Sequence, residues 1–374
     1  MTASSPFDAV VVGAGVIGAS IGYHLARAGS RVLIADPGSP LSPSASWASA
    51  GGVRRQDRDP REWELTLAAA RRWPVLEQEL GADCAFRDGG HLHVAETDGD
   101  LARLAERAAH ESEAGLDTQL VNGSEAHELA PILAPSVVGG TFTRGDGQAD
   151  PRLTTRAFLD AARRNGATYR REAIDGFLLE GGTVRGVRFG SEQVGANQVV
   201  IAAGSWSPSL AGQLGVDLPV RVEALQMLRS DPGEPVLGPT VGSESRPISF
   251  KQLPSGAFYI GGGWPADVDV AGHTCEVREA SVRGSWATAC ELFPVLRERR
   301  IDDRLCGLEG VSIDGVPIIG PLPGAGAVYV AAGFSGHGFQ ISPAVGEAVA
   351  QDLLGRSPSA LAGLRPSRFD AVWG

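Results

Sequence analysis

Short apolar runs and helix-length amphipathic segments alternate at the start of the chain. Residues 9–12 (AVVV) form an apolar run typical of a buried strand, and residues 16–28 have the spacing of a helix that ends at Gly29. A second apolar run, residues 31–35 (RVLIA), follows and ends at Asp36. Strand, helix and strand in this order predict a βαβ unit with parallel strands.

A similar alternation recurs in the middle of the chain. Residues 151–165 have the apolar spacing of an amphipathic helix, and residues 168–174 are predicted to form a strand. The apolar run at residues 199–203 (VVIAA) is a further strand. This order predicts that a parallel sheet continues beyond the N-terminal unit.

Near the C-terminus an apolar run, a glycine-rich turn and a helix follow one another. Residues 327–332 (AVYVAA) predict a buried strand, and residues 333–339 (GFSGHGF) form the turn. We expect Ser342 to cap the helix, Pro343 to take its first position and Gly355 to end it. The free N–H groups of its first turn would favour an anionic group, although an ordinary strand–helix connection also fits.

Other stretches alternate between apolar and polar positions. Residues 90–96 (GHLHVAE), 220–229 (VRVEALQMLR) and 257–264 (AFYIGGGW) suit an antiparallel sheet with one face over a site. An alanine-rich helix is predicted near residues 100–114. We expect the tail, residues 357–374, to be irregular and to lie on the surface.

Composition narrows the class of protein. Of 374 residues, 43% are hydrophobic and 21% charged, which is ordinary for a soluble globular protein of about two domains. The net charge of −11 argues against nucleic-acid binding. No apolar stretch reaches the length of a membrane span and the N-terminus lacks a signal sequence, so we expect a cytoplasmic protein.

The metal-binding residue types do not form a recognisable site. His91 and His93 share one face of their predicted strand, but no third ligand accompanies them. The cysteines lie far apart and form no CxxC pair: Cys84, Cys275, Cys290 and Cys306. We therefore expect no metal site.

The first βαβ unit carries a dinucleotide-binding pattern. Gly13, Gly15 and Gly18 form the GxGxxG motif between the first strand and the helix. They allow a tight turn, a close approach of the backbone to a diphosphate, and close packing of the helix on the strand. Asp36 ends the second strand, where it can accept hydrogen bonds from ribose hydroxyls.

The segment that follows favours FAD over NAD. Residues 37–56 (PGSPLSPSASWASAGGVRRQ) are rich in Ser, Ala and Gly, whose backbone N–H groups can approach a phosphate and a flavin ring closely. A flexible surface loop would have a similar composition.

Taken together, these motifs resemble those of the D-amino-acid oxidase superfamily of FAD-dependent oxidoreductases. The resemblance extends to glycine oxidase, sarcosine oxidase and the flavin subunits of amino-acid and opine dehydrogenases. It rests on the N-terminal βαβ unit and on five further stretches: SASWASAGGVRRQ, VVIAAGSWS, FKQLPSGAFYIGGG, LEGVSIDGVPIIG and GFSGHGF.

The resemblance implies an α/β fold of two intertwined domains. A Rossmann-like FAD-binding domain is expected from three discontinuous segments, residues 1–83, 149–219 and 305–374. Residues 84–148 and 220–304 would form an α+β substrate-binding domain with an antiparallel sheet.

It also implies a set of cofactor-binding positions. They are Gly13, Gly15, Val16, Ile17, Gly18, Asp36, Pro37, Ser44, Ser46, Ala50, Gly51, Gly52, Ala173, Ala203, Gly204, Trp206, Gly333, Gly336, His337, Gly338, Phe339 and Gln340. Relatives that bind FAD covalently use a cysteine at the position of Gly307, beside Cys306. One step along a strand reverses the side-chain direction, so non-covalent FAD is expected.

An arginine is expected to hold a substrate carboxylate, because its planar fork contacts both oxygens. Arg54 and Arg55 are the candidates, and Arg55 better matches the carboxylate-binding arginine of sarcosine-oxidase-like enzymes. The alternative is a surface pair held by Asp57 or Asp59.

Three further positions are candidates for chemistry beside the flavin. His337 would lie close to the ring, or would be an ordinary turn histidine bonded to backbone. Glu309 stands where glycine-oxidase-like members carry arginine, and Gln340 where sarcosine-oxidase-like members carry lysine. If Glu309 faces the pocket, it favours a cationic or polyamine-like substrate. If Glu309 lies on a solvated rim, it would have no role.

Lys251 is the only lysine in the chain. A cation beside the flavin would stabilise the negative charge that forms on oxygen. The oxygen-activating lysine position of the family is occupied by Tyr259, so an ordinary strand lysine is the alternative.

The function implied is FAD-dependent oxidation of the C–N bond of an amine or amino acid, with electrons passed to oxygen. The alternatives are the flavin subunit of a hetero-oligomeric opine, proline or sarcosine dehydrogenase, which would need a partner subunit and a redox acceptor, and an FAD protein with a non-amine substrate.

Overall fold

The N-terminal βαβ unit forms the centre of an eight-stranded sheet. β1 (Phe7–Val12) and β2 (Val32–Ala35) pair in parallel and α1 (Val16–Arg27) connects them. Val10 and Val11 are both completely buried, although neighbouring residues of a strand point to opposite faces. The sheet is therefore covered on both sides, as parallel sheets are. This computed structural model describes residues 6–38, 43–269 and 273–370.

Strands from distant parts of the chain complete this sheet, in the order β19-β20-β11-β1-β2-β8. The added strands on that path are β8 (Thr168–Arg170), β11 (Glu192–Ile201), β19 (Ile318–Pro321) and β20 (Val328–Ala332). All pair in parallel except β19, which lies antiparallel at the edge. β9 (Gly176–Glu180) and β10 (Thr183–Phe189) extend β11 as an antiparallel hairpin.

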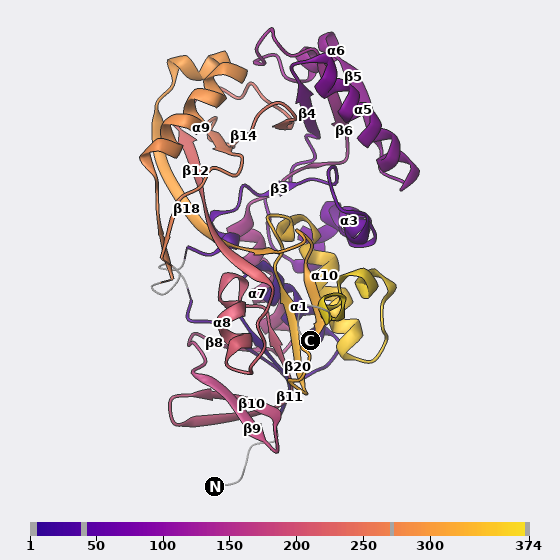
Figure 1. Cartoon of the computed structure of the whole chain (residues 1–374), viewed down its shortest axis with the longest axis vertical. Helices are drawn as coiled ribbons and strands as arrows, with labels where there is room; N and C mark the ends of the chain where they lie inside the picture. Colours follow the sequence, from indigo (N-terminus) through magenta and orange to yellow (C-terminus); the bar gives the residue numbers. More distant parts are fainter. Residues whose placement is uncertain (1–5, 39–42, 270–272, 371–374) are drawn as a thin grey trace.

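Helices cover the face of the sheet that carries Val11. They are α1, α3 (Trp63–Arg72), α7 (Pro151–Arg164) and α10 (Gly338–Leu353). The opposite face packs on the β9–β10 hairpin and on α8 (Ser207–Gly212). Figure 1 shows most of these elements in the lower half of the molecule, with α3 near its middle.

A second eight-stranded sheet lies above the first, in the order β18-β12-β15-β14-β13-β4-β6-β5. Its strands are β4 (His91–Ala95), β5 (Thr118–Asn122), β6 (Gly139–Thr143), β12 (Val220–Ser230), β13 (Thr240–Ser243), β14 (Ser249–Gln252), β15 (Phe258–Gly261) and β18 (Ile301–Ser312). All neighbours are antiparallel except β13 and β4. The long strands β12 and β18 run down from this sheet toward the first one (Figure 1).

Helices also cover one face of the second sheet. α6 (Gly123–Leu129) and α9 (Glu279–Leu292) lie on this face, whereas α5 (Asp98–Glu113) packs on the opposite face, where the Thr118 hydroxyl donates to Glu111 at 2.8 Å. Leu228 and Phe250 are buried in the core that includes α6 and α9. Their neighbours Met227 and Lys251 line a cavity instead, because side chains alternate along a strand.

Shorter elements complete the fold. They are α2 (Ala45–Ala48), α4 (Leu76–Leu80), the strand pair β3 (Gly52–Val53) and β7 (Gly147–Gln148), and the hairpin β16 (Asp267–Asp269) and β17 (Thr274–Glu276).

The predicted start of the C-terminal helix is wrong. α10 begins at Gly338, so Pro343 lies inside the helix and not at its first position. A proline there leaves the carbonyl of Phe339, four residues earlier, without its helical N–H donor. The Ser342 hydroxyl donates to that carbonyl at 2.8 Å, which is how the helix tolerates the proline.

The tail is also more ordered than predicted. Residues 359–364 and 366–369 form 3-10 turns, and Leu361, Leu364 and Phe369 are buried. Leu361 and Leu364 are three residues apart, and one turn of a 3-10 helix places such residues on the same side. The predicted strand at residues 168–174 is shorter than expected and ends at Arg170.

The packing of α1 on β1 gives a first testable prediction. A Cβ atom on Gly18 would lie 2.0 Å from the backbone oxygen of Gly13, which cannot move independently of the turn. We expect Gly18→Ala to lower the free energy of unfolding by about 1–3 kcal/mol, measured by urea unfolding. Gly212→Ala is the matched control, because a Cβ on this α8 glycine meets no atom within 4 Å. Equal midpoints for Gly18→Ala and the unsubstituted protein would contradict the close packing.

Candidate active site

A cavity of about 1390 Å³ lies between the two sheets. One side is formed where β1, β2, β11 and β20 end, and the other by residues of β12 and β14. Ligands of open α/β sheets bind outside the carboxyl ends of the strands, so the cavity has the position expected of a cofactor site.

The glycine turn and Asp36 form one end of the cavity. Gly13 has φ +106°, and a Cβ there would lie 2.4 Å from the Ala202 carbonyl oxygen. The Asp36 carboxylate accepts hydrogen bonds from the backbone N–H groups of Ala14 and Gly38, both at 2.7 Å. Gly15 caps α1 without a side-chain bond of its own, and Gly15, Val16 and Ile17 at this helix N-terminus line the cavity. This arrangement fits a dinucleotide diphosphate and its ribose.

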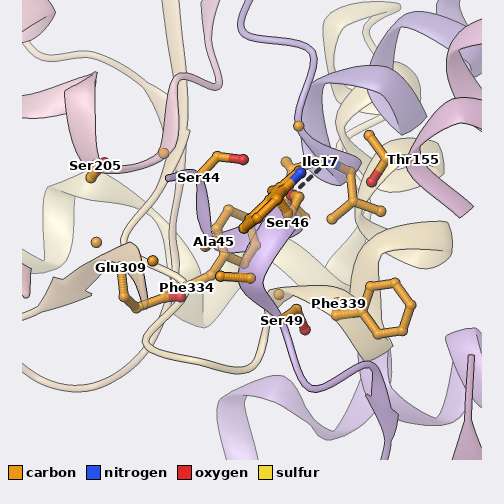
Figure 2. A pocket seen from close by; sticks show the side chains of 18 of the residues that line it. Ile17, Ser44, Ala45, Ser46, Ser49, Thr155, Ser205, Glu309, Phe334 and Phe339 are labelled. Carbon is orange, nitrogen blue, oxygen red and sulfur yellow. Dashed lines mark hydrogen bonds between the residues drawn. The ribbon is translucent and has the colours of Figure 1, made fainter. Parts of the chain in front are cut away.

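Most positions predicted to contact the cofactor line this cavity. They are Gly13, Gly15, Val16, Ile17, Asp36, Pro37, Ser44, Ser46, Ala50, Gly52, Ala173, Ala203, Gly204, Trp206, Gly333, Gly336, Gly338 and Phe339. Figure 2 shows Ile17, Ser44, Ser46 and Phe339 in the wall, with Ser46 accepting a hydrogen bond from the Val16 N–H at 3.0 Å. Gly18 and Gly51 lie behind the wall, packed against backbone carbonyls of Gly13 and Ala149.

The structure places Arg55 away from the cavity wall. Its Nε lies 2.5 Å from Asp146 Oδ1, and its backbone N–H donates to Asp146 Oδ2 at 2.9 Å. The Asp146 side chain is completely buried. Arg55 therefore has a buried structural partner, which was not among the alternatives considered for it.

His337 and Gln340 also point away from the cavity, toward α3 and the turn before it. His337 Nδ1 lies 3.2 Å from Oε1 of the fully buried Glu62, and Gln340 Nε2 donates to the Thr66 carbonyl at 3.1 Å. Burial, followed by the charge of Arg58, lowers the pKa of His337, while Glu62 raises it. The histidine is therefore neutral at neutral pH, with a side-chain partner and not the backbone partner considered earlier.

Arg54 and Arg58 line the cavity in place of Arg55. Arg58 is 9% exposed; its Nη2 donates to the Arg54 carbonyl at 3.0 Å, while Nε and Nη1 have no hydrogen-bond partner in the described ranges. Burial, and then the charge of Arg54, lowers the pKa of Arg58 to about 9. Asp57, between Arg54 and Arg58, has φ +58°, so this segment is neither a regular strand nor a regular helix. The sequence shows the group of arginines at residues 54–58, but not which of them face the cavity.

His91 is a second wall residue that the sequence analysis left outside the site. Its Nδ1 lies 2.8 Å from Thr240 Oγ1, and its buried Nε2 has no partner in the described part of the chain. Burial lowers its pKa well below the usual value, so the ring is neutral. The rings of His91 and His93 lie 5.9 Å apart, as expected for one strand face. Within the described ranges no three His, Cys, Asp or Glu side chains form a metal-binding group.

Lys251 and Glu309 both line the cavity. Lys251 is 6% exposed and stands opposite Tyr259 in the β14–β15 ladder, with its Nζ 5.7 Å from the ring centroid. Burial lowers the pKa of Lys251 to about 8, against a smaller raising effect of Asp150. Glu309 accepts the Gly336 N–H at 3.1 Å, and burial raises its pKa to about 7.

The glycine turn, the terminal acid and the charged cavity beyond them define a dinucleotide-dependent oxidoreductase. The chain belongs to the DAO family of FAD-dependent oxidoreductases, whose sequence model matches residues 8–352. FAD is therefore its cofactor, and the cavity described above fits it. No cysteine is among the described residues that line the cavity; Gly307 lines it, and the neighbouring Cys306 does not.

Individual relatives support the same family over nearly the whole chain. Glycine oxidase of Bacillus licheniformis is 30% identical over 363 residues, covering 93% of each chain. Sarcosine oxidase subunit beta of an Arthrobacter species is 26% identical and covers 95% of this chain and 89% of its own. The crystal structure of L-proline dehydrogenase from P. horikoshii has a TM-score of 0.90 at 25% identity, covering 98% of this chain and 99% of that one. Among the described helices, none combines the length and hydrophobicity needed to cross a bilayer.

Proposed function

We propose that this protein oxidises the C–N bond of an amine that carries a carboxylate, and that oxygen accepts the electrons. The observation that carries the proposal is Arg58, a buried guanidinium whose Nε and Nη1 have no partner in the described chain and which lines the cavity that holds the dinucleotide motif. A buried cation without a partner is costly unless a ligand supplies the anion.

Residues of both sheets would hold the cofactor without a covalent bond. The N–H groups at the start of α1 would contact the diphosphate, and Asp36 would contact the ribose. Bound FAD would supply the chemistry, by accepting hydride from the carbon beside the amine and passing the electrons on. The N-terminus of α10, at Gly338, would face the ring end, where its dipole favours negative charge.

Arg54 and Arg58 would orient the substrate. Their guanidinium groups can hold a carboxylate through paired, charge-assisted hydrogen bonds. The apolar wall residues, Met227, Phe334 and Phe339 among them, would surround the rest of a small substrate and exclude water.

An anaerobic titration tests the function directly. The FAD-loaded protein is mixed with a panel of amines and amino acids without oxygen, and bleaching of the yellow absorbance identifies a substrate. Admitting air should restore the colour within the turnover time. A panel that never bleaches the protein would overturn amine oxidation.

The second candidate is a dehydrogenase, in which this chain passes electrons to a partner subunit. It is favoured by the similarity to L-proline dehydrogenase, at a TM-score of 0.90, and to sarcosine oxidase subunit beta, a chain named as one subunit of an assembly. Bleaching by an amine followed by slow recovery in air would favour this candidate over the oxidase.

Removing Arg54 tests the proposed carboxylate site. Hydrogen bonds to charged groups contribute about 1.5–3 kcal/mol, so Arg54→Ala should raise KM about 10–150-fold with a smaller change in kcat. Arg54→Lys should recover part of the loss, because it keeps the charge but not the fork. Arg163→Ala, on the exposed surface of α7, is the matched control. An unchanged KM in Arg54→Ala would remove this residue from the site.

A further inference from the structure

Glu309 occupies an unusual position for a carboxylate. It lies on β18, where the ladder pairs it with Glu223 of β12, and its side chain lines the cavity. Figure 2 shows it in the wall beside Phe334, on the other side of the pocket from Thr155. Its one hydrogen bond in the described chain comes from the backbone N–H of Gly336, and it forms no ion pair there. Glu309 is therefore an acid in the cavity wall that has no cationic side-chain partner among the described residues.

The charges that line the cavity are divided between two regions. Asp36 and Glu309 are the acids among the described wall residues, and Asp36 belongs to the dinucleotide end. Arg54, Arg58 and Lys251 are bases that also line the wall, and α7 adds Arg152 and Arg156. Away from the dinucleotide end, the cavity thus offers anion-binding groups and a single carboxylate. A ligand with both a carboxylate and an amino group matches this pattern.

The surroundings of Glu309 prepare it to gain and lose a proton. Burial is the main reason that its pKa rises to about 7; the Gly336 N–H lowers it and the negative charge of Glu223 raises it. Glu223 is itself paired with Arg221 at 3.2 Å, and its side chain is 41% exposed. The neighbouring turn contributes His337, which is neutral; Arg54 and Arg58 line the same cavity, but neither is among the charges that shift the pKa of Glu309.

We propose that Glu309 binds the ammonium group of the substrate and accepts one of its protons, so that the amine is neutral before hydride leaves the adjacent carbon. In this step one N–H bond breaks, its electron pair stays on nitrogen, and an O–H bond forms on the Glu309 carboxylate. No electron is transferred. The inference rests on the proposed amine oxidation and narrows its substrate to zwitterions, primary or N-alkylated amino acids, over monoamines or simple carboxylates.

A pair of unreactive ligands tests the charge preference. Glycine betaine carries a fixed positive charge and cannot lose a proton, and 3,3-dimethylbutyrate has the same shape without that charge. Binding of each is followed through the absorbance change of the FAD-loaded protein and through the rise in unfolding temperature of the protein. We expect the unsubstituted protein to prefer betaine about tenfold or more. Glu309→Gln should bind both ligands equally.

The matched control is Glu223→Gln, which removes the acid opposite Glu309 in the same ladder pair; Glu223 is paired with Arg221 and is not among the residues that line the cavity. It should keep the preference for betaine. A preference that survives in Glu309→Gln, or that is absent from the unsubstituted protein, overturns the proposal.

The preference should also depend on pH. Glu309 is charged above its pKa of about 7, so betaine should be preferred above that pH and the preference should fade as the pH drops below it. Lys251, with a pKa of about 8, titrates nearby but affects both ligands alike, so the ratio of the two affinities isolates Glu309.

A measurement on the unsubstituted protein covers the case in which Glu309→Gln does not fold. Near pH 7, betaine should displace a proton from the partly protonated Glu309, and 3,3-dimethylbutyrate should not. Calorimetry in two buffers of different ionisation enthalpy counts that proton, and a count of zero for betaine overturns the proposal. These binding experiments need no turnover. An amine panel that never bleaches the protein would therefore overturn the proposed function. The binding of a cation by Glu309 could still be measured separately.

Discussion

Replacing Arg55 by alanine should lower the free energy of unfolding by about 3–5 kcal/mol, because it removes one partner of a buried ion pair. The Asp146 side chain is 0% exposed, and Arg55 contacts it through both Nε at 2.5 Å and the backbone N–H at 2.9 Å. Burial raises the pKa of Asp146, and the charge of Arg55 opposes that rise. Without the guanidinium, the carboxylate must stay unpaired or take up a proton. Urea unfolding at neutral pH measures the loss.

Two further variants separate stability from substrate binding. Arg54→Ala should stay within about 0.5 kcal/mol of the unsubstituted protein, because the ion pair of Arg54 in the described chain is with the half-exposed Asp57. The double substitution of Arg55 by Met and Asp146 by Leu should recover much of the stability, since apolar groups often replace a buried ion pair at little cost. If Arg55→Ala is fully stable but raises KM as Arg54→Ala is expected to, then Arg55 is the carboxylate anchor.

Replacing Lys251 by methionine should slow the reaction of the substrate-reduced protein with oxygen about 100–1000-fold, the usual effect of removing one group that stabilises developing charge. Reduction by substrate should change far less, because Arg54 and Arg58 are the proposed carboxylate-binding groups. Lys251 is buried in the cavity wall and has no hydrogen bond or ion pair in the described chain, so its ammonium is free to face oxygen. Stopped-flow mixing of the reduced protein with oxygenated buffer measures the rate.

The pH dependence gives this prediction its sign. The pKa of Lys251 is lowered to about 8, and the charged form exists below that pH. Reoxidation should therefore be fast below pH 8 and should slow as the pH rises through 8, whereas the methionine variant should show no such step. Lys251→Arg should remain fast on both sides of pH 8. Equal reoxidation rates for the methionine variant and the unsubstituted protein would return Lys251 to the role of an ordinary strand residue.

Short sequence patterns predicted those parts of the site that residues close together in the chain form. The strand, GxGxxG turn, helix and Asp36 follow one another within 30 residues, and each is where the sequence placed it. The α/β class followed from them, whereas FAD and the family also rested on residues 37–56 and on further stretches along the chain; all three are confirmed. The roles of individual wall residues remain predictions.

Positions decided by distant partners could not be inferred in the same way. Arg55 and Arg54 are neighbours with the same chemistry, and the choice between them depends on Asp146, 91 residues further along the chain. His337 turns toward Glu62, which is 275 residues away in sequence. Pro343 was assigned to a helix start because serine followed by proline is typical of that position. The sequence does not show that the Ser342 hydroxyl instead donates to the Phe339 carbonyl inside the helix.

The order of strands in the first sheet has a consequence for the timing of synthesis. β1 pairs with β11, which is synthesised roughly 190 residues after it, and β11 pairs in turn with β20, which follows β1 by roughly 320 residues. This side of the sheet therefore cannot form until those strands have been made. α1 in turn packs on α10, which ends at Leu353. Since such non-local pairings form late, a nascent chain on the ribosome would hold its glycine turn exposed and unable to retain FAD until almost the whole chain has emerged. Cofactor capture would then mark the end of folding and not its beginning.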